Sequence, residues 1–296
     1  MVKRTHAYWG GQKVRMIINI GIMQGRLLPR FEDRYQAHPI QIWPSEFYIA
    51  RELGFSSIEF ILDYNQVSKN PLMYDEGLKL IQEIITKTNV AVNSICADYF
   101  MHAPFHSEYQ RESEKLLIKL IDNAEKINIK DIVIPCVDES SLKNDLDMDK
   151  LYQSLSKILP RAEEKNIYIN LETDLQPLKL RDFISSFNSN NIKINYDSGN
   201  SSSLGYDINE EFELYGNYIS DVHIKDRKLN GESVILGSGD ADIKQLFNLI
   251  YAYKLEKNII MQAFREYDYI DDINSVKTQK KYLEDLIKEV NNDKEI

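Results

Sequence analysis

Eight short apolar runs rich in β-forming residues recur along the chain, and a helical pattern follows each of them. The runs cover residues 17–22, 57–60, 91–97, 132–136, 167–171, 192–196, 221–224 and 259–261. They are apolar throughout rather than alternating, which indicates parallel strands that are buried on both faces. Eight repeats of strand and helix are the number that a closed (β/α)8 barrel requires. We therefore predict an α/β protein that folds as a single TIM barrel.

The segments between the runs carry apolar stripes at helical spacing, as in residues 116–127 and 282–290. Asp207 followed by Glu210 is typical of a helix start, and Gly216 of a helix end. A doubly wound open sheet is the alternative fold. It is disfavoured because the chain contains neither GxGxxG nor GxxxxGK[ST].

The chain has 296 residues, and we predict one domain over residues 16–296 after a loose N-terminal extension, residues 1–15. The extension has a basic start but no apolar segment behind it, so it is not a secretory signal. Only two cysteines, Cys96 and Cys136, occur, which rules out a disulfide framework and favours a reducing compartment. No apolar run approaches the roughly 18 residues of a membrane span. We expect a cytoplasmic protein that does not interact with membranes.

The net charge of the chain is −10. Proteins that bind nucleic acids rely on clustered Lys and Arg, so this charge argues against a nucleic-acid partner. It does not exclude a small anionic ligand, which needs only two or three local cations.

The connections from strand to helix are long, whereas those from helix to strand are short. Barrel enzymes build their sites from the strand-to-helix loops, at the C-terminal ends of the strands. Ionisable residues placed where a strand ends are therefore the candidates for function. The long connections are residues 24–44, 62–72, 98–111, 137–147 and 225–240.

The last four predicted strands each end on a potential metal ligand. These residues are Glu172, Asp197, His223 and Gln262. Neighbouring strands of a barrel can bring two carboxylates, an imidazole and an amide oxygen to one point. A single acidic residue at a strand end is usually a helix cap or half of a salt bridge, but three ligand types at matched depth favour a metal site. This mixed set suits one divalent ion, Mn²⁺, Mg²⁺, Co²⁺ or Zn²⁺, with open positions for substrate oxygens.

These strand ends resemble a known superfamily. The motifs NLETD, NYDSGN and VHIKDR, with the LGSGDADI loop at residues 236–243, are similar to those of xylose isomerase-like barrels. Within that superfamily the resemblance is to the sugar phosphate isomerases and epimerases, which include ketose 3-epimerases. GIMQGRLLP at residues 21–29 and ICADYF at residues 95–100 add to it. The resemblance runs from about residue 16 to residue 290.

The resemblance implies a metal-dependent isomerase or epimerase that acts on a small sugar or sugar phosphate. Its metal would be bound by Glu172, Asp197, His223 and the residue at Gln262. The metal would polarise the sugar carbonyl and stabilise an enediolate, while Glu172 takes the proton from the neighbouring carbon. Barrels of this type often pair, which leaves a homodimer open.

The chain departs from the ketose 3-epimerases at two positions. They have a glutamate where this chain has Gln262, and a substrate-contacting histidine near Asn200. An amide can coordinate a metal but cannot shuttle a proton at ordinary pH. Two-base epimerisation through residue 262 is therefore in doubt, whereas a one-base 1,2-shift or the use of another acid stays open. The candidates for that acid are Glu59, Asp98, Lys225 and Asp226.

Several residues at the predicted mouth are candidates for contacting substrate. Arg26 follows the first strand, where its guanidinium suits an anion or a hydroxyl, although it could instead pair with Glu59 or Asp98. Lys225 lies two residues after His223 on the same strand face, so we assign it to catalysis together with Asp226. The predicted substrate-binding set is Arg26, Glu59, Asp98, Asn200, Arg227 and Arg265.

Three other functions compete with the isomerase. An endonuclease IV-like enzyme shares the fold but needs three zinc ions and additional histidines, where this chain has Asp98, Cys136 and Asn200. Gln262 would also fit a metal- or sugar-binding barrel without turnover. A dehydratase of an inosose-like ring would use the same metal-assisted proton removal.

Overall fold

The structure is a computed structural model that describes residues 18–255, 258–265 and 269–293. The predicted extension, residues 1–15, and the predicted start of the domain at residue 16 lie outside the described residues. Within them, no helix combines the length and apolar character needed to cross a membrane.

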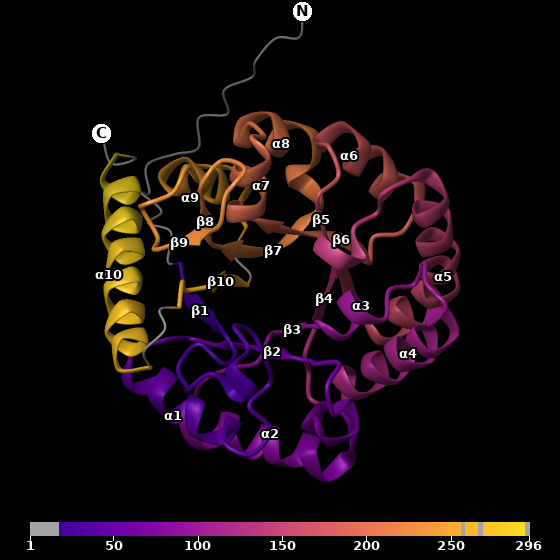
Figure 1. Ribbon diagram of the computed structural model, residues 1–296, viewed down its shortest axis with the longest axis horizontal. Helices are drawn as coiled ribbons and strands as arrows, with labels where there is room; N and C mark the ends of the chain where they lie inside the picture. Colours follow the sequence, from indigo (N-terminus) through magenta and orange to yellow (C-terminus); the bar gives the residue numbers. More distant parts are fainter. Residues whose placement is uncertain (1–17, 256–257, 266–268, 294–296) are drawn as a thin grey trace, which may run out of the picture.

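Eight parallel strands close into a barrel, which confirms the predicted (β/α)8 fold (Figure 1). The strands follow one another around the ring in chain order, and β1 closes it by pairing with the last strand, β10. In that pairing Ile20 lies opposite Ile259. The barrel strands are β1 (Ile20–Met23), β2 (Ile58–Ile61), β3 (Ser94–Cys96), β4 (Asp131–Cys136), β5 (Tyr168–Thr173), β6 (Ile192–Asp197), β7 (Ile219–Ile224) and β10 (Ile259–Met261).

A ring of helices surrounds the barrel (Figure 1). Their apolar stripes pack on the strands, as in α4, where Leu117, Leu120 and Ile121 are fully buried. The predicted helix start at Asp207 is confirmed, because its carboxylate accepts the N–H groups of residues 209 and 210. The outer helices are α1 (Trp43–Glu52), α2 (Asp75–Thr88), α4 (Gln110–Lys126), α5 (Asp145–Lys165), α6 (Pro177–Ser186), α8 (Ile208–Tyr215), α9 (Ile243–Tyr253) and α10 (Tyr269–Asp293).

The observed strands lie within a few residues of the predicted runs. The third run differs most, because only residues 94–96 form β3 while Ala91 makes a single bridge to Ser57. The strand-to-helix connections contain elements that the sequence pattern did not predict. They are α3 (Tyr99–His102), α7 (Ser198–Leu204), the hairpin of β8 (Asp226–Arg227) and β9 (Ser233–Val234), and 3-10 turns at Phe31–Asp33, Val67–Lys69, Pro71–Met73 and Asp138–Ser140, with another at Gly216–Tyr218 before β7.

Candidate active site

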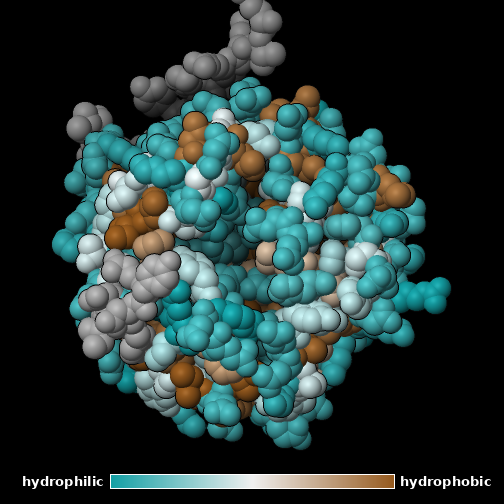
Figure 2. Space-filling view, viewed as in Figure 1, coloured by the Kyte–Doolittle hydropathy of each residue, from teal (hydrophilic) through white to brown (hydrophobic). Residues whose placement is uncertain are grey.

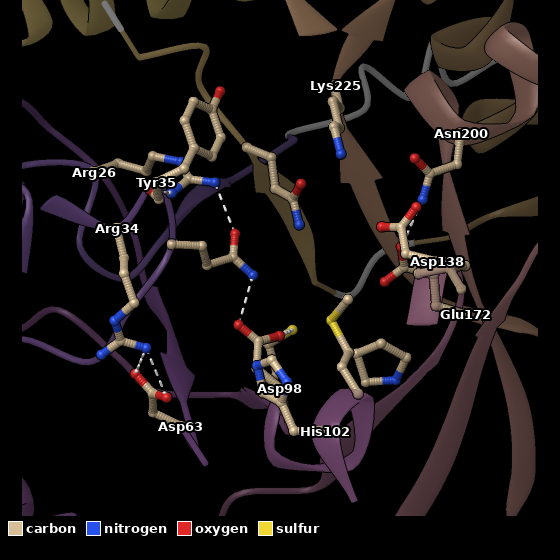
Figure 3. Close-up of a pocket in the computed structure, with 16 residues that line it drawn as sticks. Arg26, Arg34, Tyr35, Asp63, Asp98, His102, Asp138, Glu172, Asn200 and Lys225 are labelled. Carbon is tan, nitrogen blue, oxygen red and sulfur yellow. Dashed lines mark hydrogen bonds and ion pairs between the residues drawn. The ribbon is translucent and has the colours of Figure 1, made fainter. Parts of the chain in front are cut away.

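A cavity of about 260 Å³ opens at the C-terminal ends of the strands. Figure 2 shows the surface hollowed near the centre of the helix ring, with hydrophilic residues around the opening. Six of the predicted site residues line the cavity, and Figure 3 shows how most of them face it. These six are Arg26, Asp98, Glu172, Asn200, Lys225 and Gln262.

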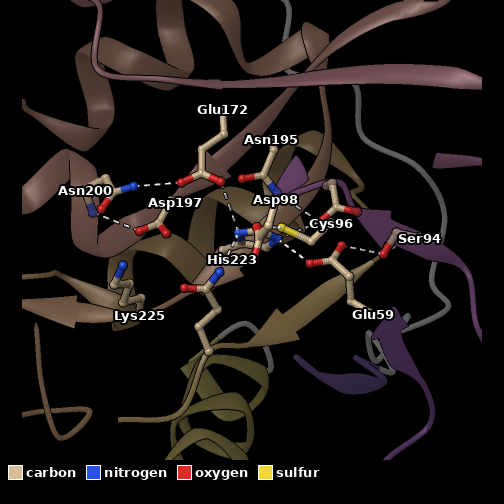
Figure 4. A network of polar contacts seen from close by, with 12 residues as sticks. Glu59, Ser94, Cys96, Asp98, Glu172, Asn195, Asp197, Asn200, His223 and Lys225 are labelled. Atoms are coloured by element: carbon tan, nitrogen blue, oxygen red, sulfur yellow. Dashed lines mark hydrogen bonds and ion pairs between the residues drawn. The ribbon is translucent and has the colours of Figure 1, made fainter. Parts of the chain in front are cut away.

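Three of the four predicted metal ligands converge beside this cavity. One ligand atom each of Glu172, Asp197 and His223 lies within 4.8 Å of the other two (Figure 4). Nε2 of Gln262 lies 3.1 Å from Nδ1 of His223, so the side chain of the fourth predicted ligand reaches the same cluster. Oδ2 of Asp197 is buried without a hydrogen-bond partner among the described residues. Because such an atom is costly to bury alone, it indicates a missing positive partner.

Glu59 fixes the orientation of the His223 ring through the ring nitrogen Nε2. Its Oε2 lies 2.7 Å from Nε2 of His223, and its Oε1 accepts the Ser94 hydroxyl at 2.6 Å. A carboxylate on one ring nitrogen sets the tautomer, so that the other nitrogen can bind a metal. Here Nδ1 is that other nitrogen, and it lies 3.6 Å from Oε2 of Glu172. Glu59 does not line the cavity, and its predicted substrate contact stays a prediction.

The electrostatics of this cluster favour a bound cation. Glu59, Glu172, Asp197 and Asp221 are all buried around a single imidazole. Burial and the neighbouring Asp197 raise the pKa of Glu172 to about 7. Burial lowers the pKa of His223, but the charge and hydrogen bond of Glu59 outweigh it and raise that pKa to about 10. Uncompensated carboxylates are costly to bury, and a divalent ion would neutralise them. The residues therefore fit the predicted metal.

We expect metal binding to release protons. In the metal-free protein His223 holds a proton up to about pH 10 and Glu172 up to about pH 7, and both must lose it to become ligands. Affinity should therefore rise with pH, with one proton released near pH 8 and up to two near pH 6. Calorimetric titration with Mn²⁺ in buffers of different ionisation enthalpy measures this number. His223→Ala should weaken Mn²⁺ binding, and pH-independent binding by the wild-type protein would contradict the assignment.

Asn200 connects the two carboxylates of the cluster. Its side-chain amide donates to Oε1 of Glu172 at 2.7 Å, and its backbone N–H donates to Oδ1 of Asp197 at 2.8 Å. Arg227 donates in turn to Oδ1 of Asn200 at 3.0 Å and to the carbonyl of Gly231 at 2.9 Å. Arg227 lies outside the cavity lining. It positions Asn200, and its predicted substrate contact stays a prediction.

Asp226, a predicted catalytic residue, is hydrogen-bonded through its carboxylate to the loop that follows the β8–β9 hairpin. Its carboxylate accepts the backbone N–H groups of Gly237, Gly239 and Ala241 at 2.8 to 3.1 Å. A Cβ at residue 239 would lie 1.9 Å from Oδ1 of Asp226, so only glycine fits there. Asp226 does not line the cavity. It anchors the LGSGDADI loop, and its catalytic role stays a prediction.

Arg265 is also engaged by the protein itself. It forms a buried ion pair with Asp272 at 3.2 Å and donates to the carbonyl of Leu28 at 2.7 Å. It lies outside the cavity lining, and its predicted substrate contact stays a prediction. Because Leu28 belongs to the connection after β1, Arg265 fixes that connection against the end of β10.

The connection after β1 contributes cavity residues that the sequence did not single out. Arg26 donates to the carbonyl of Tyr35 at 2.9 Å and to the side chain of Gln36 at 2.7 Å. Tyr35 and Gln36 line the cavity with Arg26, but no local pattern marks them. The other lining residues that sequence reasoning missed include Arg34, Asp63, His102 and Asp138.

Comparison with known proteins identifies the family. Residues 47–286 match the xylose isomerase-like TIM barrel family, so the chain belongs to it. The chain is 23% identical over 242 residues to a Haemophilus influenzae protein provisionally named L-ribulose-5-phosphate 3-epimerase SgbU. This match covers 76% of the chain and 84% of the relative.

Two solved structures share the fold at low sequence identity. An L-ribulose 3-epimerase superposes with a TM-score of 0.74 at 16% identity, over 94% of this chain and 97% of that one. The IolI protein with a bound zinc atom superposes with a TM-score of 0.71 at 14% identity, over 92% of this chain and 99% of that one. At these identities the structures support the fold alone.

Proposed function

We propose that this chain is a divalent-metal-dependent isomerase or epimerase of a small sugar or sugar phosphate. The convergence of Glu172, Asp197 and His223 beside an open polar cavity carries this proposal. The names of the epimerases that resemble the chain support it, and the zinc of the IolI structure supports a metal in this family. Mn²⁺, Mg²⁺, Co²⁺ or Zn²⁺ would suit the mixed oxygen and nitrogen ligands.

When bound, the metal would act as a Lewis acid that polarises the sugar carbonyl and stabilises the negative charge of an enediolate. Glu172 removes the proton from the carbon beside that carbonyl. A carboxylate can take and return a proton in this way when it is held beside the reacting carbon. The amide of Asn200 holds the Glu172 carboxylate in place.

Gln262 has a different part in this reaction. Its amide faces His223 and can offer an oxygen ligand, but it cannot carry a proton. Lys225 directs its amine into the cavity and supplies a positive charge near Glu172 (Figure 3). Lys225 and Arg26 are therefore the groups that we assign to binding sugar oxygens.

We expect the metal-loaded protein to exchange one carbon-bound hydrogen of its substrate with solvent. Incubation with ketoses, aldoses and their phosphates in D₂O, followed by NMR, would place deuterium at one carbon and identify both the sugar and the reacting position. Protein stripped of metal with a chelator is the control and should give no exchange. Absence of exchange with every sugar would contradict the proposal and favour a binding protein. Three equivalents of zinc per chain would instead favour the nuclease chemistry.

A further inference from the structure

A second carboxylate, that of Asp98, lines the cavity on a different wall from Glu172. Asp98 follows β3, whereas Glu172 ends β5. Asp98 lies two residues after the end of β3, and Pro135 on the neighbouring strand β4 pairs with Glu172 on β5. All three line the cavity, and Figure 3 shows Asp98 and Glu172 on different sides of it. A sugar between these walls would meet both carboxylates.

The Asp98 carboxylate is held by two donors. Gln36 donates to Oδ2 at 2.8 Å, and the Cys96 thiol donates to Oδ1 at 3.1 Å. Gln36 is in turn held by Arg26 at 2.7 Å. Neither donor forms an ion pair with the carboxylate, and burial raises the pKa of Asp98 although both donors lower it. This environment allows Asp98 to exist as a carboxylic acid as well as a carboxylate.

We propose that Asp98 is the second acid–base residue of this site and that the reaction is therefore an epimerisation. The proposal rests on the function proposed above. Glu172 takes the proton from the carbon beside the carbonyl, and the electrons of the broken C–H bond move to the carbonyl oxygen as the enediolate forms. The Asp98 carboxylic acid then gives its proton to the opposite face of the same carbon, and the carbonyl reforms. Each carboxyl group regains its starting protonation by exchange with water.

The other groups at the cavity fit this role less well. Gln262 lines the cavity, but its amide cannot act as an acid or a base at ordinary pH. Asp226 and Glu59 lie outside the cavity lining and are hydrogen-bonded to the protein. Asp63 is held in an ion pair with Arg34, and Asp138 and His102 are exposed to solvent. Lys225 is the alternative that most needs a test, and its replacement is part of that test.

The test compares proton exchange with inversion in Asp98→Asn. The metal-loaded variant is incubated in D₂O with the sugar that the wild-type protein converts, and both epimers are followed by NMR. Loss of a general acid should lower formation of the epimer by about 10² to 10⁴-fold. Deuterium should still enter the starting sugar within about tenfold of the wild-type rate, because Glu172 can return a deuteron to the same face. A role of Asp98 in binding or folding alone would lower both rates together.

The outcomes separate the two proposals. If the wild-type protein exchanges no hydrogen with any sugar, the proposed function fails and this inference fails with it. If Asp98→Asn forms the epimer at the wild-type rate, only this inference is overturned. Retained exchange with lost inversion in Lys225→Met, together with an active Asp98→Asn, would assign the second group to Lys225.

Two further variants guard against an effect on folding. Asp98→Ala leaves space for a small acid, so added formate should restore part of the inversion, whereas no rescue and lost exchange would count against the proposal. Glu108→Gln is the matched control, since Glu108 is an exposed carboxylate in the same connection after β3 and lies outside the cavity lining. It should invert and exchange like the wild-type protein, and thermal unfolding should show that all variants are folded.

Discussion

Glu172→Gln should lower turnover by about 10² to 10⁴-fold at saturating metal, because the amide cannot accept the substrate proton. The change keeps the shape of the side chain and one oxygen that can still face the metal. Glu172 is 6% exposed and lies at the cavity wall rather than in the apolar core, so the fold should be kept. Steady-state rates with the identified sugar, together with metal content and circular dichroism, measure this effect.

Asp174→Asn is the matched control for this variant. Asp174 lies two residues further along the chain and does not line the cavity. The control should therefore keep wild-type turnover and metal content. Glu172→Gln with full activity at saturating metal would show that another group is the base.

Arg265→Leu should lower the free energy of unfolding by about 3–5 kcal/mol, the cost of leaving one charge of a buried pair without its partner. Both side chains of the Arg265–Asp272 pair are only 2% exposed. The variant also removes the donor to the carbonyl of Leu28. Urea unfolding followed by circular dichroism measures the change.

Two comparisons test the cause of that loss. Arg161→Leu makes the same change at an exposed ion pair with Asp122, where solvent screens the charges, so stability should change little. The double variant Arg265→Leu/Asp272→Leu removes both buried charges and should recover part of the loss. Equal effects at Arg265 and Arg161, or no recovery, would contradict the explanation.

The fold could be predicted because its signal is repeated and local. Each strand is a short, mainly apolar run and the helices carry apolar stripes, so eight weak patterns support one architecture. The ends of the strands then indicated which residues meet, since parallel strands present their C-terminal ends on one face. This reasoning placed Glu172, Asp197 and His223 together, as the structure has them.

The partners of the loop residues could not be predicted in this way. Asp226 accepts N–H groups from residues 237 to 241 because the hairpin of β8 and β9 turns that loop back, and no strand period reports such a turn. Gln36 reaches Asp98 across 62 positions of sequence. The Cys96 thiol could have been identified as a neighbour of the Asp98 carboxylate, since only one residue separates the two in the sequence.

The pairing of β1 with β10 has a consequence for how the protein is made. On the ribosome β1 can pair with β2 early, but its other edge finds its partner only after residue 261 has emerged. Until then the nascent chain presents unpaired backbone N–H and C=O groups, a surface prone to aggregation. Arg265, which secures Leu28, is synthesised later still. The wall that holds Arg26 and Gln36 is therefore completed last, so a prematurely terminated chain would lack an assembled cavity.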